Sequence, residues 1–274
     1  MKYAIVILLL LSLPLNVFAA LSDSIVSCYE LDEVSGTRID ATATGNDLSD
    51  NNTVGSAAGI VSGNSADFEE GGAEYLSITD ATQTGLDITG DRSVSFWGTW
   101  ELTNDYTVPE SKYNAAGSVS WLFRIDPDST PNILFYQHDG TTLNSGSINY
   151  SFTPNGTVYH IVYRYDASAA TVEFFVNGST IGTMTSMGSS VQNSNSEFKL
   201  GLGNPGGAEY WDGKMDVYAI WDKVLTNDEI AELYNSGSGV SCVGILPAAS
   251  GSEAPNDFIQ IIGKLIHKII SMFA

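Results

Sequence analysis

Few side chains in this sequence are spaced for catalysis. The three histidines, His138, His160 and His267, are not accompanied by a Gly-x-Ser-x-Gly elbow before a helix, so a hydrolytic triad is not supported. A retaining glycosidase needs two carboxylates about 5 Å apart. The nearest pattern, Glu30-Leu-Asp-Glu33, is better interpreted as a strand end that enters a turn. These residues predict a protein that is not an enzyme.

Aromatic residues on loops offer a different chemistry, because sugar rings stack on the faces of Tyr and Trp while amides and carboxylates bind hydroxyl groups. Residues 104–117 form one candidate loop, and residues 204–211 form a second, glycine-rich one. For the aromatic pair that ends the second loop, packing in the core is the alternative. The candidate ligand-binding residues are Tyr106 and Tyr113 in the first loop, and Tyr210 and Trp211 in the second.

Composition limits the kinds of partner. The chain has 11 Lys and Arg against 32 Asp and Glu, a net charge of −21 at pH 7. Such a charge argues against nucleic acid or any other polyanion as a ligand. The apolar fraction of 43% with five Trp is enough for one core. We see no internal repeat and no second domain.

The elements that must position these side chains are short strands. Runs rich in β-forming residues recur between clusters of Gly, Asn, Asp and Ser, with no helical segments between them, which indicates an antiparallel sandwich or jelly roll. The dipeptide Asn177-Gly178 predicts a type I′ hairpin turn. The predicted strands are 25–31, 66–69, 74–78, 93–102, 119–125, 133–137, 147–152, 158–165, 171–176, 179–184, 197–202 and 214–221.

The last strand leads into a short helix. Residues 214–221 alternate with a period of two, and the pattern then changes to the helical spacing of Ile230 and Leu233. Thr226 and Glu229 form a capping box, and Leu225 with Ile230 has the spacing of a hydrophobic staple. The sequence therefore predicts that a β domain ends in one well-defined helix over residues 227–234.

This C-terminal segment resembles the signature of laminin-G-like jelly-roll domains of the concanavalin A-like superfamily. Four further segments are similar to the family's strands in the same order, over residues 29–36, 93–97, 159–166 and 174–178. The resemblance covers the chain from about residue 24 to residue 240. It implies the jelly-roll fold, but it says little about function, because this fold hosts lectins, glycosidases, adhesion modules and passive spacers.

The resemblance also implies a structural calcium ion. Calcium binds carboxylates and backbone carbonyls, and the family's site corresponds to Asp40, the carbonyl of Gly45, Asn46 and Asp216. The alternative is that Asp40 and Asn46 form a local Asx turn while Asp216 faces water.

The N-terminus indicates secretion. An apolar run over residues 4–13, Pro14 and a small-residue site ending at Ala19 predict a signal peptide over residues 1–19, with a membrane anchor as the alternative. In an oxidising compartment Cys28 and Cys242 have one intramolecular pairing available, with two unpaired buried thiols as the alternative. In the domains that the chain resembles, the corresponding segments lie side by side, which implies that the pair is bonded.

The C-terminus differs from the rest of the chain. Residues 244–256 form a linker of small residues and proline, and residues 257–274 predict an amphipathic helix with one broad apolar face. Lys264 and Lys268 near its middle disfavour a membrane span. The remaining alternatives are a helix on anionic lipid, self-association through heptad-spaced positions, or docking onto the sandwich.

Together these observations predict a secreted protein, extracellular or periplasmic, with a sandwich over residues 20–243. We expect it to bind carbohydrate or a surface partner without catalysis, tethered or multimerised by its C-terminal helix. A structural or adhesive surface component is the main alternative, and a glycoside hydrolase-like enzyme has the least support.

Overall fold

The computed structural model describes residues 20–101, 106–114, 119–126, 132–203 and 209–247. The predicted signal peptide and the predicted tail helix therefore lie outside the described residues. Among the described residues, no helix has the length and apolarity that a membrane crossing requires.

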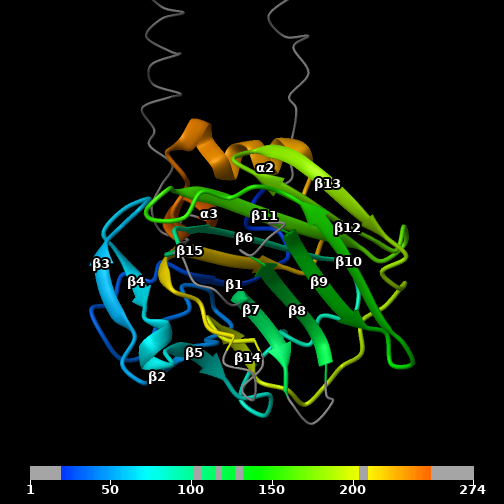
Figure 1. Ribbon diagram of the computed structural model, residues 1–274, viewed down its shortest axis with the longest axis horizontal. Coiled ribbons are helices and arrows are strands. Elements are labelled where there is room, and N and C mark those ends of the chain that lie inside the picture. Colours follow the sequence, from blue (N-terminus) through cyan, green and yellow to red (C-terminus); the bar gives the residue numbers. More distant parts are fainter. Residues whose placement is uncertain (1–19, 102–105, 115–118, 127–131, 204–208, 248–274) are drawn as a thin grey trace, which may run out of the picture.

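Two antiparallel sheets stacked face to face form the body of the protein (Figure 1). The larger sheet has eight strands, and β15 lies near its centre and also pairs with the first strand, β1. In spatial order its strands are β13 (Ser179–Thr185), β12 (Thr171–Val176), β11 (Tyr159–Asp166), β6 (Arg92–Gly98), β15 (Gly213–Trp221), β4 (Asn64–Phe68) and β3 (Gly55–Ala58), with β1 (Ile25–Tyr29) beside β15.

The second sheet has seven strands. The chain crosses between the two sheets several times, and the jelly-roll sandwich that the sequence predicts is confirmed. In spatial order its strands are β10 (Leu143–Asn149), β9 (Asn132–His138), β8 (Val119–Asp126), β7 (Thr107–Tyr113), β14 (Phe198–Leu200), β5 (Tyr75–Ile78) and β2 (Ser49–Asn51).

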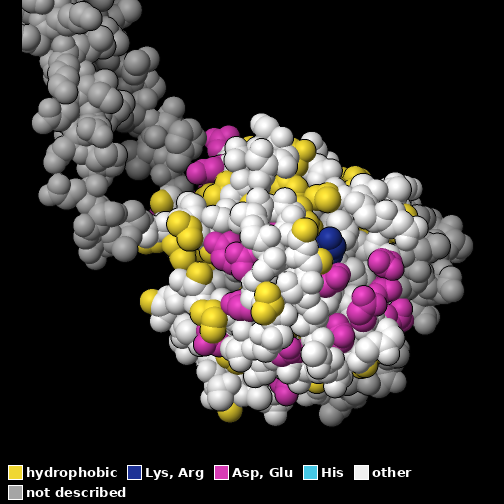
Figure 2. Space-filling model, turned by 90° about the vertical axis from the view of Figure 1, so that its left-hand side faces the viewer, with side chains coloured by type: hydrophobic (Ala, Val, Ile, Leu, Met, Phe, Trp, Pro, Cys, Tyr) yellow, Lys and Arg dark blue, Asp and Glu magenta, His cyan; other side chains and the backbone are white. Residues whose placement is uncertain are grey.

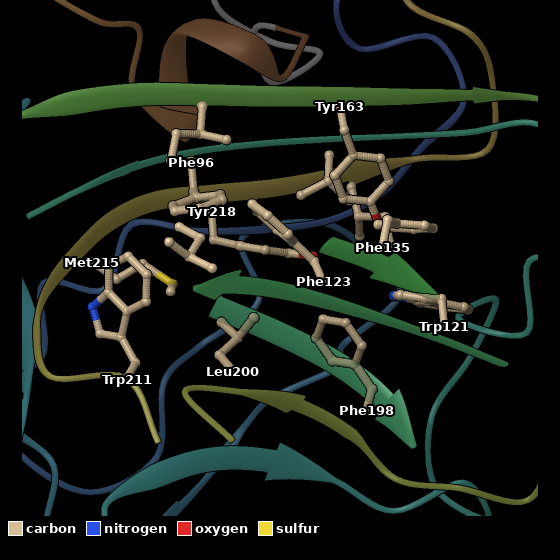
Figure 3. Packing of buried hydrophobic residues seen from close by; sticks show 14 of the residues in the cluster. Phe96, Trp121, Phe123, Phe135, Tyr163, Phe198, Leu200, Trp211, Met215 and Tyr218 are labelled. Carbon is tan, nitrogen blue, oxygen red and sulfur yellow. The ribbon is translucent and has the colours of Figure 1, made fainter. Parts of the chain in front are cut away.

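The main core fills the space between the sheets, where aromatic rings dominate (Figure 3). Phe96 and Tyr218 of the larger sheet stack with centroids 6.3 Å apart, and Phe123 of the smaller sheet lies 6.3 Å from Phe96. Rings of this size bury large apolar areas, so they supply most of the force that holds the two sheets together.

A second core lies on the other face of the eight-stranded sheet, beneath helices α2 (Asn227–Tyr234) and α3 (Cys242–Ile245) (Figure 1). The predicted capping box of α2 is confirmed, since Thr226 and Glu229 exchange both hydrogen bonds. Leu225 and Ile230 are both buried in this second core, as a hydrophobic staple requires. Two 3-10 turns, η1 (Glu70–Gly72) and η2 (Asn235–Gly237), complete the helical segments of the described chain.

Cys28 in β1 and Cys242 at the start of α3 form a disulfide, with their Cα atoms 5.8 Å apart. The predicted pairing is confirmed, and the alternative of two unpaired thiols is wrong. Both residues are fully buried in the second core, so the bond ties the first strand to the segment that follows α2.

The prediction of a loop over residues 104–117 is wrong in its middle, because residues 107–113 form β7, which pairs with β8 and β14. The reason is that β7 turns charged residues inward. Glu110 is fully buried between the sheets, where its carboxyl accepts hydrogen bonds from Tyr163 and Tyr218, and burial raises the pKa of Glu110. A strand with a polar inner face lacks the hydrophobic alternation that sequence analysis detects.

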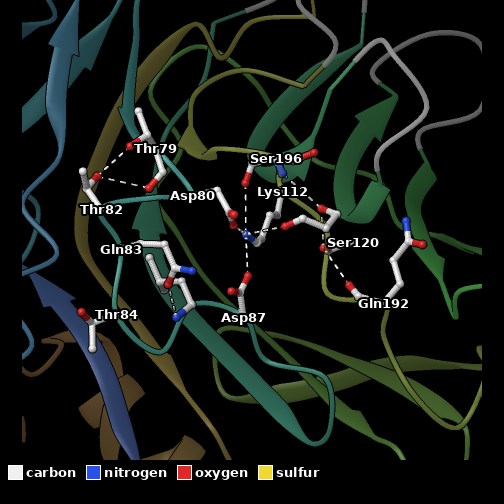
Figure 4. A network of polar contacts seen from close by, with 12 residues as sticks. Thr79, Asp80, Thr82, Gln83, Thr84, Asp87, Lys112, Ser120, Gln192 and Ser196 are labelled. Atoms are coloured by element: carbon white, nitrogen blue, oxygen red, sulfur yellow. Dashed lines mark hydrogen bonds and ion pairs between the residues drawn. The ribbon is translucent and has the colours of Figure 1, made fainter.

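Lys112 is the second buried charge of β7 (Figure 4). Its Nζ lies 2.6 Å from Asp80 and 2.8 Å from Asp87, and it also donates to the carbonyls of Ser194 and Ser196. These partners satisfy the ammonium group, which buried charges require. The strands β2 and β3, which the sequence analysis also missed, have no large side chains with a period of two.

Candidate functional site

The outer face of the seven-stranded sheet is the candidate site, because α2 and α3 cover the outer face of the other sheet (Figure 1). Strand register determines which side chains reach this outer face. Leu122 pairs with Tyr136, and Arg124 pairs with Leu134, while the residues between them in β8 and β9 point into the core. Aromatic, aliphatic and cationic side chains therefore share one exposed surface.

This surface contains a hollow of about 170 Å³. Small-molecule sites commonly measure roughly 300–1,000 Å³, so the hollow accommodates part of a larger ligand rather than a whole one. Its floor and walls are mostly apolar. The lining residues are Tyr113, Val119, Leu122, Arg124, Tyr136 and Leu143.

Arg124 is the charged residue of the hollow. Its guanidinium lies 4.3 Å from the ring centroid of Tyr106 and 5.4 Å from that of Tyr136, and its Nη2 donates to a carboxylate oxygen of Glu209. Glu209 is 85 residues away in sequence, within the second predicted loop. Cation–π contacts and the ion pair together fix the guanidinium in place.

Two polar atoms of this pair have no partner. Arg124 Nε and Glu209 Oε2 are buried, and neither makes a hydrogen bond in the described structure. A buried polar group without a partner costs free energy, so this ion pair leaves one donor and one acceptor unsatisfied in the described structure.

The structure divides the predicted aromatic residues into two groups. Tyr106 is 40% exposed and lies over Arg124, and Tyr113 lines the hollow. Trp211 is instead fully buried, with its ring centroid 6.1 Å from that of Phe96. The prediction that Trp211 contacts a ligand is therefore corrected, because the residue is part of the core. Tyr210 is half-buried beside an isolated bridge to Leu202, and residues 204–208 of its predicted loop lie outside the described residues.

Sequence reasoning missed Arg124, Tyr136 and Glu209. The signal for Tyr136 was present, because Ile133 and Phe135 point into the core and the residues that alternate with them must point outward. The pairing of Arg124 with Glu209 joins two distant segments and has no local sequence signal.

The predicted calcium ligands have different hydrogen-bond partners. The carboxylate of Asp40 accepts hydrogen bonds at both oxygens, from the backbone N–H of Cys28 and Asn46 and from the hydroxyls of Thr42 and Thr44. These donors leave no free carboxylate oxygen for a metal. The side chain of Asn46 is likewise bonded to Ser27 and the backbone of Thr84, and Gly45 has the positive φ of 69° that the turn requires.

Asp216 has different partners. Its Oδ2 accepts from the backbone N–H groups of Ile60 and Val61, while its Oδ1 is buried without a partner. The alternative that Asp216 faces water is therefore wrong. Burial, opposed by these hydrogen bonds and reinforced by the charge of Asp32, raises the pKa of Asp216 to about 6. No group of three or more His, Cys, Asp or Glu in the described part of the chain is arranged to hold a metal ion.

The other titratable candidates are structural. His160 is buried against the rings of Trp97 and Tyr234, 4.8 and 5.9 Å away, and burial lowers its pKa to about 3. His138 ends β9, and its Nδ1 accepts from the backbone of Gly140, as expected for a turn.

Comparison with known proteins identifies the family. A family model described as the concanavalin A-like lectin/glucanases superfamily matches residues 70–231, more than half of the chain. The chain belongs to this superfamily. A comparison with curated proteins finds no significant match.

Several solved structures have a similar fold. The chain is similar to the binding domain of Paraclostridial Mosquitocidal Protein 1, with a TM-score of 0.63 and 15% identity over 79% of this chain and 53% of that one. It is similar to the binding domain of Botulinum Neurotoxin DC in complex with SialylT, with a TM-score of 0.60 and 12% identity over 79% and 52%. The chain thus spans about half the length of these toxin domains.

A third structure is matched over nearly its full length. It is domain 4 of an extracellular arabinanase from Geobacillus stearothermophilus, in complex with arabinotriose, with a TM-score of 0.59 and 18% identity over 76% of this chain and 97% of that one. At these identities the structural comparisons establish a shared fold, and the binding properties belong to the matched proteins.

Proposed function

We propose that this protein is a secreted, non-catalytic carbohydrate-binding module whose ligand lies on the outer face of the seven-stranded sheet. The observation that carries the proposal is the hollow, which is lined by apolar side chains, by the tyrosines Tyr113 and Tyr136, and by Arg124. Arabinotriose bound to a domain of similar fold supports a glycan as the ligand. The disulfide supports an oxidising compartment, extracellular or periplasmic.

The first prediction tests this face. We expect the protein to bind at least one member of a panel of neutral oligosaccharides that includes arabinotriose. We expect Tyr136→Ala to raise the dissociation constant of that ligand at least tenfold, about 1.4 kcal/mol, because it removes a ring from the wall of the hollow. Isothermal titration calorimetry on the full chain measures the change.

Tyr234→Ala is the matched control, since Tyr234 is also half-buried but lies in α2, over the other sheet. This variant should bind with the affinity of the wild type. Wild-type affinity in Tyr136→Ala would place the ligand elsewhere, and absence of binding to the whole panel would contradict a carbohydrate function.

A structural calcium ion is the second part of the proposal. Asp216 fits it best, because its Oδ1 is buried without a partner and the charge of Asp32 acts on it. Asp40 fits poorly, because protein donors occupy its oxygens. We expect calcium to raise the melting temperature relative to a chelator, with about 2.7 kcal/mol of stabilisation at a hundredfold excess over the dissociation constant.

Two variants separate the aspartates in this melting experiment. Asp216→Asn should abolish the difference between calcium and chelator, whereas Asp40→Asn should lower the melting temperature in both conditions and keep the difference. Identical wild-type melting curves in the two conditions would eliminate the calcium site.

The tail is the third part of the proposal, in which residues 257–274 attach the module to anionic lipid or to copies of itself. A helix with so broad an apolar face gains roughly 1.5–3 kcal/mol for each large side chain that it buries. Deletion of residues 256–274 should therefore release the protein from anionic vesicles or convert an oligomer to a monomer. Vesicle flotation and light scattering measure these two outcomes. A full-length protein that is monomeric and does not bind anionic vesicles would refute both lipid attachment and self-association.

A further inference from the structure

We infer that the free edge of β10 is an interaction surface, on which a second copy of this chain adds its own β10 in antiparallel orientation. The surface consists of the backbone of residues 143–149 and the side chains that β10 presents outward. The inference concerns assembly through the sandwich itself, so it goes beyond both ligand binding and the tail.

The backbone of β10 is open on one side. All seven of its residues pair in register with β9, and β10 is the last strand in the order of its sheet. In the described part of the chain, no segment other than β9 forms backbone hydrogen bonds with residues 143–149. Alternate residues of an antiparallel strand direct their N–H and C=O groups away from the neighbour. β10 therefore presents a row of unpaired donors and acceptors.

The other edge strands are guarded. Proteins protect such edges with short strands, bulges, charges or covering loops. β2 and β3 have only three and four residues, and β13 has a register shift between its pairs with Phe174 and Phe175. Residues 40–44 cover β1, because the N–H of Ala41 and the hydroxyl of Thr44 bond to its carbonyls. Among the described edge strands, β10 alone combines seven residues, a regular register and an uncovered edge.

The side chains of β10 suit a second copy of the same strand. Its sequence, Leu-Asn-Ser-Gly-Ser-Ile-Asn, contains no charged residue and no proline, which are the residues that natural edges use against pairing. Ser145 pairs with Tyr136, which lines the hollow, so every second residue of β10 points to the outer face. These outward residues are all exposed and uncharged: Leu143, Ser145, Ser147 and Asn149.

A two-fold axis gives this pairing its register. Two copies of one strand related by such an axis run antiparallel, and each contact occurs twice. An axis at Gly146, the middle residue of β10, gives every residue of the strand a partner. Ser145 then faces Ser147 of the other copy, and Leu143 faces Asn149. No like charges lie opposite one another in this register, as a stable strand pair requires.

The charge of the chain favours association on this side of the sandwich. Two chains that each carry a net charge of −21 repel one another. Figure 2 shows the side of β3 and β4, where Asp and Glu side chains clearly outnumber Lys and Arg. β10 lies near β13, on the opposite side of the sandwich (Figure 1). Pairing through β10 therefore leaves the two acidic surfaces at the far ends of the assembly.

The assembly would place two hollows on one continuous sheet. Leu143 belongs both to β10 and to the lining of the hollow, so the paired edge lies directly beside the candidate ligand site. A polymeric glycan that reaches both hollows would bind with avidity, because its second contact is intramolecular. This consequence rests on the proposed function, whereas the pairing itself does not.

Site-specific cross-linking of the full chain tests the pairing. In Ser145→Cys with Ser147→Cys, each thiol faces a thiol of the other copy, at the Cβ separation of about 4.5–5.5 Å that directly opposed residues have. Mild oxidation should therefore give a covalent dimer on a denaturing gel without reductant. Thr183→Cys with Thr185→Cys is the matched control, because both residues are exposed on the edge strand β13 with the same spacing. The control should remain a monomer on the same gel.

Lysine substitution gives an independent measurement. Ser145→Lys with Ser147→Lys places like charges directly opposite each other, so the dissociation constant of the dimer should rise at least about tenfold. Thr183→Lys with Thr185→Lys adds the same charge to the chain and should leave this constant unchanged. Analytical ultracentrifugation of the full chain over a range of concentrations measures the constant, and thermal melting checks that each variant is folded.

Three results would overturn the inference while the proposed function stands. One is a wild type that is monomeric at every concentration. Another is equal cross-linking, or none, in the two cysteine variants. The third is association that the β10 lysine variant retains and that deletion of residues 256–274 abolishes, which would assign it to the tail. Failure of the wild type to bind any oligosaccharide would overturn the proposed function alone, because mass and cross-linking are measured without a ligand.

Discussion

Replacing both Cys28 and Cys242 by alanine is expected to lower the free energy of unfolding by about 2–5 kcal/mol. The disulfide joins residues 214 apart in sequence, so nearly the whole sandwich lies inside one covalent loop. Cross-linking so long a segment restricts the unfolded chain strongly, and the chain-entropy model gives on the order of 5 kcal/mol as an upper value. Urea unfolding followed by tryptophan fluorescence measures the change.

Reduction of the wild type with dithiothreitol under denaturing conditions is the control, because it breaks the same bond without a substitution. The reduced wild type and the double variant should unfold at similar urea concentrations, both below that of the oxidised protein. An unchanged midpoint in the double variant, or two reactive thiols in the native protein, would show that the bond is absent.

Trp211→Ala is expected to cost about 3–5 kcal/mol, the usual range for deleting a large aromatic side chain from a core. Trp211 is fully buried and packs against Phe96 and Trp100, with ring centroids 6.1 and 5.5 Å away. Its neighbour Tyr210 is half-buried, so Tyr210→Ala should cost well under half as much. Chemical denaturation of the two variants gives the comparison.

The same pair distinguishes stability from binding. Trp211→Ala should lower the stability of the unliganded sandwich, which a ligand-contact residue on an exposed loop would not do. If the two substitutions cost equal amounts, or if Trp211→Ala leaves stability unchanged, Trp211 does not belong to the core in which the structure places it.

Local patterns were sufficient for much of the fold. The alternation over residues 214–221, the Asn177-Gly178 turn and the Thr226–Glu229 capping box involve residues close in sequence, and the structure contains all three elements. At Asn177 and Gly178 both φ angles are positive, as a type I′ turn requires. The two cysteines left one possible intramolecular pairing, and the structure contains it.

The tertiary structure determines which charged residues are buried between the sheets. Sequence patterns do not predict β7, because two of its buried residues, Glu110 and Lys112, are charged. Their partners are distant in sequence: Tyr163 and Tyr218 for Glu110, and Asp80 and Asp87 for Lys112. A period of two in hydrophobicity cannot appear where buried positions are polar. Only the assembled sheets show that these charges have partners.

The candidate site depends on tertiary structure in the same way. Trp211 and Tyr210 are adjacent aromatic residues, and only the packing of the two sheets determines that one is buried and the other half-exposed. Arg124 lies on β8, and the chain returns to the same surface 85 residues later, at Glu209. The two residues form an ion pair only because the fold brings these segments together. Propensity and periodicity act over a few residues, whereas burial and charge pairing are properties of surfaces that form only when distant strands come together.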